Sequence, residues 1–168
     1  MKRFWHLFWI FTLIVIALQM FIMFPEMPET IPTHFDFKGN ADGWSSKDSF
    51  LIIMIVVILG INIWYPLIGF LGHKMPRSLV NIPNKDYWYA TPKRKEQMLA
   101  VFNVMMAMIF GIMNVIFIYL LYYTYQMAME REPVMELWFI IIPIVIIAIY
   151  PIIYLYKKLK IPANSHSN

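Results

Sequence analysis

Four long stretches without charged residues constrain this chain more than any other feature. They run over residues 4–24, 49–72, 97–126 and 137–156. A helix needs about 20 apolar residues to cross the roughly 30 Å hydrocarbon core of a bilayer, and each stretch reaches that length. Only helices satisfy their own backbone hydrogen bonds within a single segment in lipid. We therefore predict an all-α, polytopic membrane protein with four transmembrane helices, in which residues 1–168 form a single membrane domain.

The composition excludes several other classes of protein. Hydrophobic residues make up 60% of the chain and charged residues 14%, whereas soluble domains average about 45–50% and about 25%. A soluble enzyme or a nucleic-acid binder is therefore not expected. The chain has no cysteine, which excludes a thiol nucleophile, a disulfide and a cysteine-ligated metal.

The distribution of lysine and arginine predicts the orientation. These residues are concentrated at the N-terminus, in residues 73–96 and in the C-terminal tail, whereas residues 25–48 contain only Lys38 and Lys47. Short loops rich in lysine and arginine stay in the cytoplasm. We therefore predict an N-in, C-in topology with an outer loop at residues 25–48 and an inner loop at residues 73–96.

The outer loop is expected to form a small ordered cap with a short β-hairpin. Its Gly39-Asn40 and Asp42-Gly43 pairs are typical turn sequences. Alternation over residues 33–37 should place His34 and Asp36 side by side on one face of a strand. The candidate ligand-binding residues of this loop are His34, Phe35, Asp36, Gly39, Asn40, Asp42, Gly43 and Trp44.

The polar residues of the outer loop leave three chemical interpretations open. His34, Asp36 and Asp42 could ligate a metal, although Lys38 and Ser49 stand where an EF-hand loop needs acids. The same side chains could instead satisfy backbone groups in tight turns. A hydrolase using Ser45 or Ser46 is the least favoured interpretation, because no nucleophile elbow is present. No other cofactor is expected.

The inner loop contains a second polar motif with aromatic residues and flanking cations. It could lie on anionic lipid as an amphipathic segment, or it could dock a cytoplasmic protein partner. The motif comprises Asn81, Pro83, Asn84, Lys85, Tyr87 and Trp88.

A stripe of small and amide residues marks one face of the third span. Its members recur every three or four positions, which places them on one side of a helix. Small residues let helices approach closely, and asparagine can hydrogen-bond across the contact. The stripe could pack the bundle, form a homodimer or line a polar cavity, with Asn62 as a partner from the second span. Its residues are Asn103, Ala107, Gly111 and Asn114. Pro66, Pro143 and Pro151 are expected to kink their helices.

Both loops resemble signatures of a known family. The outer signature is Ile31-Pro32-Thr33-His34-Phe35-Asp36 followed by Gly39-Asn40-Ala41-Asp42-Gly43-Trp44, and the inner one is Asn81-Ile82-Pro83-Asn84-Lys85-Asp86-Tyr87-Trp88. They resemble a bacterial membrane domain of unassigned function at the N-terminus of SdpI-like proteins. The resemblance implies a multi-pass protein of the bacterial inner membrane. The family's named member gives immunity to a secreted peptide toxin and relays the toxin's presence to a cytoplasmic repressor.

These observations lead to an expected function. The outer loop would sense a peptide or other envelope ligand, or confer immunity to it, and the inner loop would relay the signal to a cytoplasmic partner. No catalytic residue is assigned. The alternatives are a metal-dependent membrane enzyme using His34, Asp36 and Asp42, and a small carrier or structural subunit built on the amide stripe.

Overall fold

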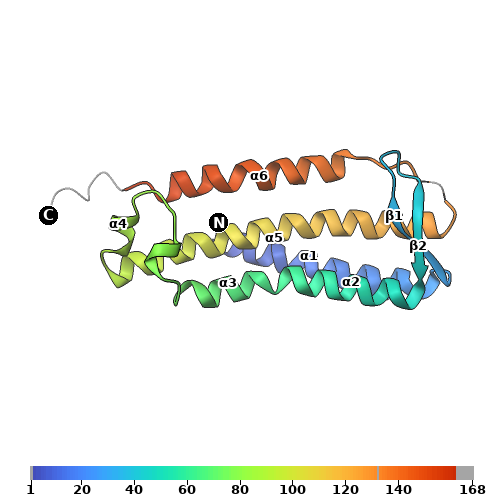
Figure 1. The fold of residues 1–168 in the computed structure, drawn as a ribbon, viewed down its shortest axis with the longest axis horizontal. Coiled ribbons are helices and arrows are strands. Elements are labelled where there is room, and N and C mark those ends of the chain that lie inside the picture. Colours follow the sequence, from blue (N-terminus) through green and yellow to red (C-terminus); the bar gives the residue numbers. More distant parts are fainter. Residues whose placement is uncertain (1, 132, 162–168) are drawn as a thin grey trace.

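A computed structural model describes residues 2–131 and 133–161 of the chain. Within these residues, four helical segments are long and apolar enough to cross a membrane, which confirms the predicted fold class. The helices run side by side along the long axis of the molecule (Figure 1). The segments are α1 (Lys2–Met23), extended by the 3-10 turn η1 (Phe24–Glu26); α2 (Lys47–Asn62) with α3 (Trp64–Gly72); α5 (Pro92–Ala128); and α6 (Trp138–Lys158).

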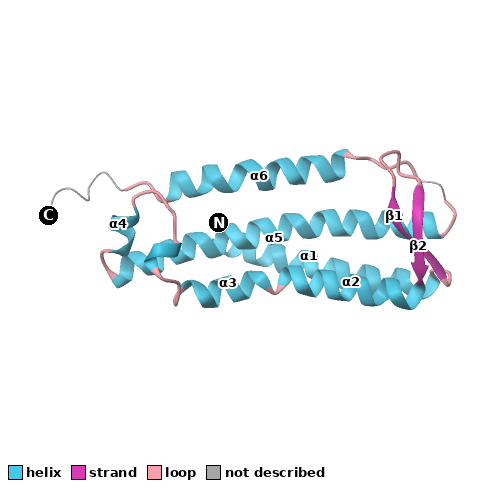
Figure 2. Cartoon of the chain, in the orientation of Figure 1, coloured by secondary structure: helices cyan, strands magenta, loops and turns pink. Residues whose placement is uncertain are grey.

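The predicted β-hairpin is also confirmed. Strands β1 (Thr30–Phe35) and β2 (Ala41–Ser46) pair antiparallel at one end of the bundle. The opposite end holds the 3-10 turn η2 (Arg77–Leu79) and the short helix α4 (Lys85–Tyr89) (Figure 2). The two polar motifs therefore lie at opposite ends of the bundle.

Helix α5 is the central element of the fold. Its 37 residues span roughly 55 Å, which is well beyond the hydrocarbon thickness of about 30 Å. It starts at a capping residue, Thr91, whose hydroxyl accepts a hydrogen bond from the Arg94 amide, and Pro92 occupies the first helical position. The helix packs against α1, α3, α4, α6 and β1. It is longer at both ends than the predicted span, so its two ends reach the two polar motifs.

One small residue of α5, Gly111, lies against α1. Ala107 and Gly111 are buried. A Cβ atom at Gly111 would lie 2.7 Å from Cδ1 of Phe8 and 3.5 Å from Cα of Trp9. Only a residue without a side chain lets the two backbones approach this closely. The structure thus places Gly111 in a contact within one chain.

A buried hydrogen-bond network joins three helices beside this contact. Asn62 and Asn114 exchange amide hydrogen bonds of 3.0 and 3.1 Å. The Trp9 indole donates to Oδ1 of Asn62 at 2.8 Å, and the Asn114 amide donates to the Thr12 hydroxyl at 3.1 Å. The Asn62 amide also donates to the Ile58 carbonyl, so each side-chain polar atom of the two asparagines has a partner. An unpaired amide in hydrocarbon costs several kcal/mol, so the network favours one arrangement of α1, α2 and α5.

The second span is interrupted next to this network. Ile63 separates α2 from α3, and Pro66 has no amide proton to donate to the Asn62 carbonyl. By contrast, α6 is one continuous helix that includes Pro143 and Pro151. Asn62, whose side chain belongs to the network, is therefore the last residue of α2.

Replacing Asn114 by alanine should destabilise the bundle by about 1–2 kcal/mol, because the buried Asn62 amide and Thr12 hydroxyl each lose a hydrogen-bond partner. Reversible unfolding by SDS in mixed micelles measures the change. The matched control is Asn103→Ala on the same helix, since within the described residues the Asn103 side chain makes no hydrogen bond. An equal loss in both variants would contradict the assigned role of the network.

Candidate functional site

The hairpin is seated on the end of α5. The Tyr123 hydroxyl donates a 2.7 Å hydrogen bond to the Gly39 carbonyl, and the Tyr123 ring meets Phe35 edge to face at 5.2 Å. Ile31 is fully buried in a core with Leu121 and Tyr125 of α5. The hairpin is thus part of the packed structure and not a flexible tether.

Lys47 fastens the start of the hairpin to the start of α2. Its ammonium group donates to the carbonyls of Pro25 at 3.1 Å and Met27 at 2.6 Å. Its backbone amide donates to the Glu29 carbonyl at 2.9 Å. Ser46, directly before it, caps α2 by accepting a hydrogen bond from the Ser49 amide. The chain therefore enters and leaves the hairpin through one hydrogen-bonded junction.

Asp36 organises the turn between the two strands. One carboxylate oxygen accepts hydrogen bonds from the amides of Lys38 and Asn40, and the other accepts from the Asn40 side chain at 3.0 Å. The Asn40 side-chain hydrogen bond is the main reason why the pKa of Asp36 is lowered. Gly39 adopts φ 88° in the same turn. Asp36 is therefore engaged with backbone and amide donors.

The expected pairing of His34 with Asp36 is wrong. The strand register is irregular on both sides of His34, and Asp36 lies beyond the end of β1. His34 Nδ1 instead contacts the carboxylate of Asp42 on β2. Gly43 faces His34, where a Cβ atom would lie 3.0 Å from the His34 Cβ. The irregular register accounts for the difference, because simple alternation does not hold through a bulge.

The geometry of the loop disfavours the catalytic interpretations. In residues 2–131 and 133–161, no three histidine or acidic side chains form a group that could hold a metal. Ser46 is occupied as a helix cap, and the Ser45 hydroxyl contacts the Ser46 carbonyl at 3.5 Å. The structure therefore brings His34 and Asp42 together without a third ligand or a nucleophile.

Trp44 is an exposed aromatic residue at this end, between two clefts. Its side chain is 59% exposed, although it sits on an ordered strand. One cleft beside it measures about 640 Å³ and is bordered by residues 38–41, Tyr123, Met127 and residues 133–134. A second cleft of about 530 Å³ is bordered by residues 28–30, Pro32, Ala41, residues 127–128 and Glu130. Both volumes fall within the range of about 300–1,000 Å³ typical of ligand sites.

The inner motif folds around the end of α6. The Asn84 side chain and the Trp88 indole both donate to the Leu159 carbonyl, at 3.0 and 2.9 Å. Asn84 adopts φ 57°, a conformation that asparagine tolerates well. The Tyr87 ring stacks under the Arg94 guanidinium at 4.0 Å. Asn84 and Trp88 therefore hold the C-terminal helix end, whereas Asn81 lines a separate pocket.

Several structural residues were not predicted from the sequence. In the first span, Trp9, Thr12 and Gln19 all reach other helices through hydrogen bonds, the last to the Ile118 carbonyl. Thr12 and Gln19 are seven positions apart, and this spacing on one helix face was a usable signal. Nothing in the spacing of the tyrosines near the end of the third span indicated that Tyr123 would hold the hairpin.

Comparison with known proteins identifies part of the chain. Residues 7–60 match the "Domain of unknown function (DUF1648)", a family of membrane proteins that includes SdpI-like members. The match covers most of α1, the hairpin and most of α2, but not the inner motif. No curated protein matches the chain. No solved structure matches it either.

Replacing Gly39 by alanine should displace the hairpin from α5. The new Cβ would lie 2.7 Å from the Tyr123 hydroxyl and 2.8 Å from Cβ of Met135, at a φ that alanine disfavours. Hydrogen exchange should become faster over residues 30–46. Gly60→Ala is the matched control, because nothing lies within 4 Å of its Cβ position. Unchanged exchange in Gly39→Ala would refute the seating contact.

The order of the turn should depend on the ionisation of Asp36. Because the pKa of Asp36 is lowered from 3.8 in the folded protein, the carboxylate stabilises the turn above that value. This contribution is lost as the pH falls through the lowered pKa. NMR shifts of the Lys38 and Asn40 amides should therefore stay constant down to about pH 4 and change below it. Asp36→Asn should abolish this transition and Asp48→Asn should keep it. Any other result would show that the amide shifts report the ionisation of a group other than Asp36.

Proposed function

We propose that this chain is a bacterial inner-membrane protein that senses a peptide or other envelope ligand, or confers immunity to it, through the hairpin end. The exposed Trp44 between two clefts carries the proposal. Exposed aromatic side chains next to pockets are frequent anchors in recognition surfaces. The predicted N-in, C-in topology would place this surface outside the cell, where it can meet a secreted ligand.

The form of the surface favours an extended peptide. A two-stranded sheet leaves one edge of each strand without a sheet partner, and extended peptides commonly bind by adding to such an edge. The wall of the larger cleft contains the polar residues Lys38 and Asn40 and the apolar residues Met127 and Val134. Such a surface can receive alternate side chains of a peptide while its backbone pairs with a strand.

The arrangement of α5 supports a relay to the cytoplasmic side. Its C-terminal end contacts the hairpin through Tyr123, and its N-terminal end contacts α4 of the inner motif. A continuous helix transmits displacement along its axis better than a jointed one. Movement of the hairpin would thus reach the loop that holds the end of α6, where a cytoplasmic protein could respond.

The test exposes a bacterial strain to the secreted peptides of a second bacterium that kills it. Survival is compared with and without expression of this chain. Expression should raise survival, and Trp44→Ala should weaken protection roughly 30-fold at equal expression, because loss of an aromatic anchor costs about 2 kcal/mol or more. Trp138→Ala is the matched control, since Trp138 is equally exposed at the same end but opens α6.

Three outcomes would contradict the proposal. The first is full protection by Trp44→Ala, which would show that the surface is not the recognition site. The second is an equal loss in Trp138→Ala, which would indicate a general requirement for aromatic residues at the membrane surface. Survival that does not depend on expression at all would refute both sensing and immunity toward that peptide fraction.

A further inference from the structure

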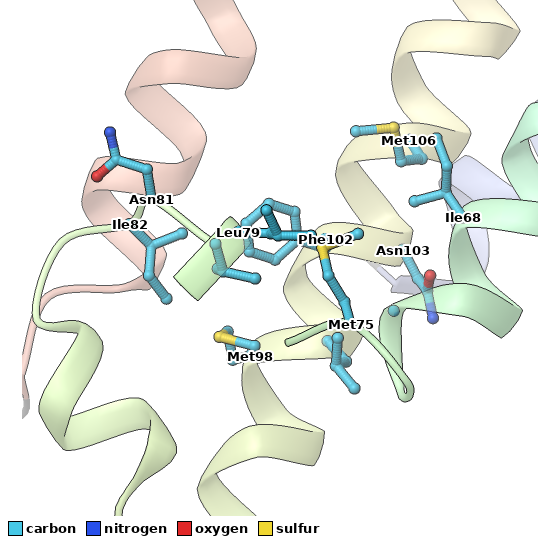
Figure 3. Close-up of a pocket in the computed structure, with 12 residues that line it drawn as sticks. Ile68, Met75, Leu79, Asn81, Ile82, Met98, Phe102, Asn103 and Met106 are labelled. Atoms are coloured by element: carbon cyan, nitrogen blue, oxygen red, sulfur yellow. The ribbon is translucent and has the colours of Figure 1, made fainter. Parts of the chain in front are cut away.

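A pocket at the other end of the bundle has no role in the function proposed above. It is a partly open cavity of about 270 Å³ between α3, α5 and the segment that precedes α4. Leu79 and Phe102 lie in its centre, with Ile82 on one side and Met106 and Ile68 on the other (Figure 3). Its lining residues on α5 lie between Met98 and Met106, well before Tyr123 at the hairpin seat. The pocket shares no lining residue with the clefts around Trp44.

The lining is suited to hydrocarbon. Apart from Asn81 and Asn103, every side chain that borders the pocket is apolar. Its volume is just below the range of about 300–1,000 Å³ typical of sites for drug-sized ligands, so it fits a slender chain better than a polycyclic molecule. Flexible methionine side chains form three of its walls, Met75, Met98 and Met106, and can adjust to an irregular occupant.

The position of the pocket indicates where such a chain would come from. Ile68, Phe102 and Met106 belong to helices long and apolar enough to cross a membrane, whereas Leu79 and Ile82 belong to the polar loop. The pocket thus lies where hydrocarbon gives way to the headgroup region. The nearest abundant hydrocarbon chains at that depth are those of the bilayer itself.

The charges around the pocket favour an anionic headgroup. Residues 73–96 carry six lysines and arginines against two acids, namely Lys74, Arg77, Lys85, Lys93, Arg94 and Lys95 against Asp86 and Glu96. Lys74 directly precedes Met75 of the lining, and its ammonium lies 4.9 Å from the centre of the exposed Phe70 ring. In the described part of the chain, Lys74 joins no ion pair, whereas Arg77 pairs with Asp86.

We propose that this pocket binds one acyl chain of an anionic phospholipid from the surrounding bilayer, with the headgroup phosphate at Lys74. The apolar walls bury the chain, and the lysine selects the charge of the headgroup. The site requires no particular orientation of the protein and is independent of ligand recognition at the hairpin.

Native mass spectrometry of the purified, delipidated full chain tests the proposal with phosphatidylglycerol and phosphatidylcholine as probes. One phosphatidylglycerol per protomer should bind about fivefold more tightly than phosphatidylcholine, which is the effect of one lysine near an anionic group. Lys74→Gln should remove this preference. Lys93→Gln is the matched control with the same loss of charge in the same loop, and it should keep the preference.

A second variant tests the chain-binding part of the site. Met75→Trp places a larger side chain in the pocket and should weaken binding of both lipids about tenfold, since even two methylenes left unburied cost that much. Thermal unfolding in the same detergent establishes whether the variant is folded. If the variant is unfolded, the unaltered protein is instead photocrosslinked with phosphatidylglycerol that carries a diazirine in its acyl chain. Peptide mapping should then locate the label within residues 68–82 and 98–106.

Three results would overturn the proposal. Equal binding of the two lipids would remove the assigned role of Lys74. Unchanged binding by folded Met75→Trp, or crosslinks spread over α6 instead of the pocket, would show that the acyl chain lies elsewhere. A dimer in place of a lipid adduct would identify a second copy of the chain as the occupant.

Discussion

The reciprocal amide pair between Asn62 and Asn114 is the interaction on which the bundle depends. In a bilayer, an apolar side chain gains little free energy by exchanging contacts with lipid for contacts with another helix. Hydrophobicity alone therefore does not specify how the helices pack. A polar pair is different, because separating it leaves donors and acceptors in hydrocarbon. Trp9 and Thr12 extend the pair to α1, so that a single network joins three of the spans. The close approach at Gly111 brings α1 and α5 near enough for this network to form.

The position of the hairpin follows from that arrangement. Tyr123 and Leu121 lie on the same helix as Asn114, two to three turns further along α5. Once α1, α2 and α5 are fixed by the buried network, the segment between α1 and α2 must end close to the C-terminal part of α5. Ile31 then reaches a core made by all three elements. The surface around Trp44 is therefore built on the rigid part of the molecule, which is favourable for recognition because little order has to be gained on binding.

Much of the fold could be predicted from residue patterns, and the limits have physical causes. The uncharged stretches determine the spans because their length matches the bilayer, and the turn sequences around Gly39 and Asp42 indicate a hairpin. The partner of His34 could not be predicted, because a bulge shifts the strand register and local alternation does not report it. The contact of Asn84 and Trp88 with the Leu159 carbonyl could not be predicted either, because it joins segments more than 70 residues apart. Composition carries no information on such a distant acceptor.

The junction made by Lys47 has a consequence for how the outer segment can move. Its ammonium and amide tie residues 25–29 to the first turn of α2, so the strands leave and rejoin the bundle at one point. With Tyr123 holding the tip, the hairpin is clamped at both ends and has no free hinge. A ligand on this surface would therefore shift the hairpin as a lever together with α5 instead of opening it like a flap.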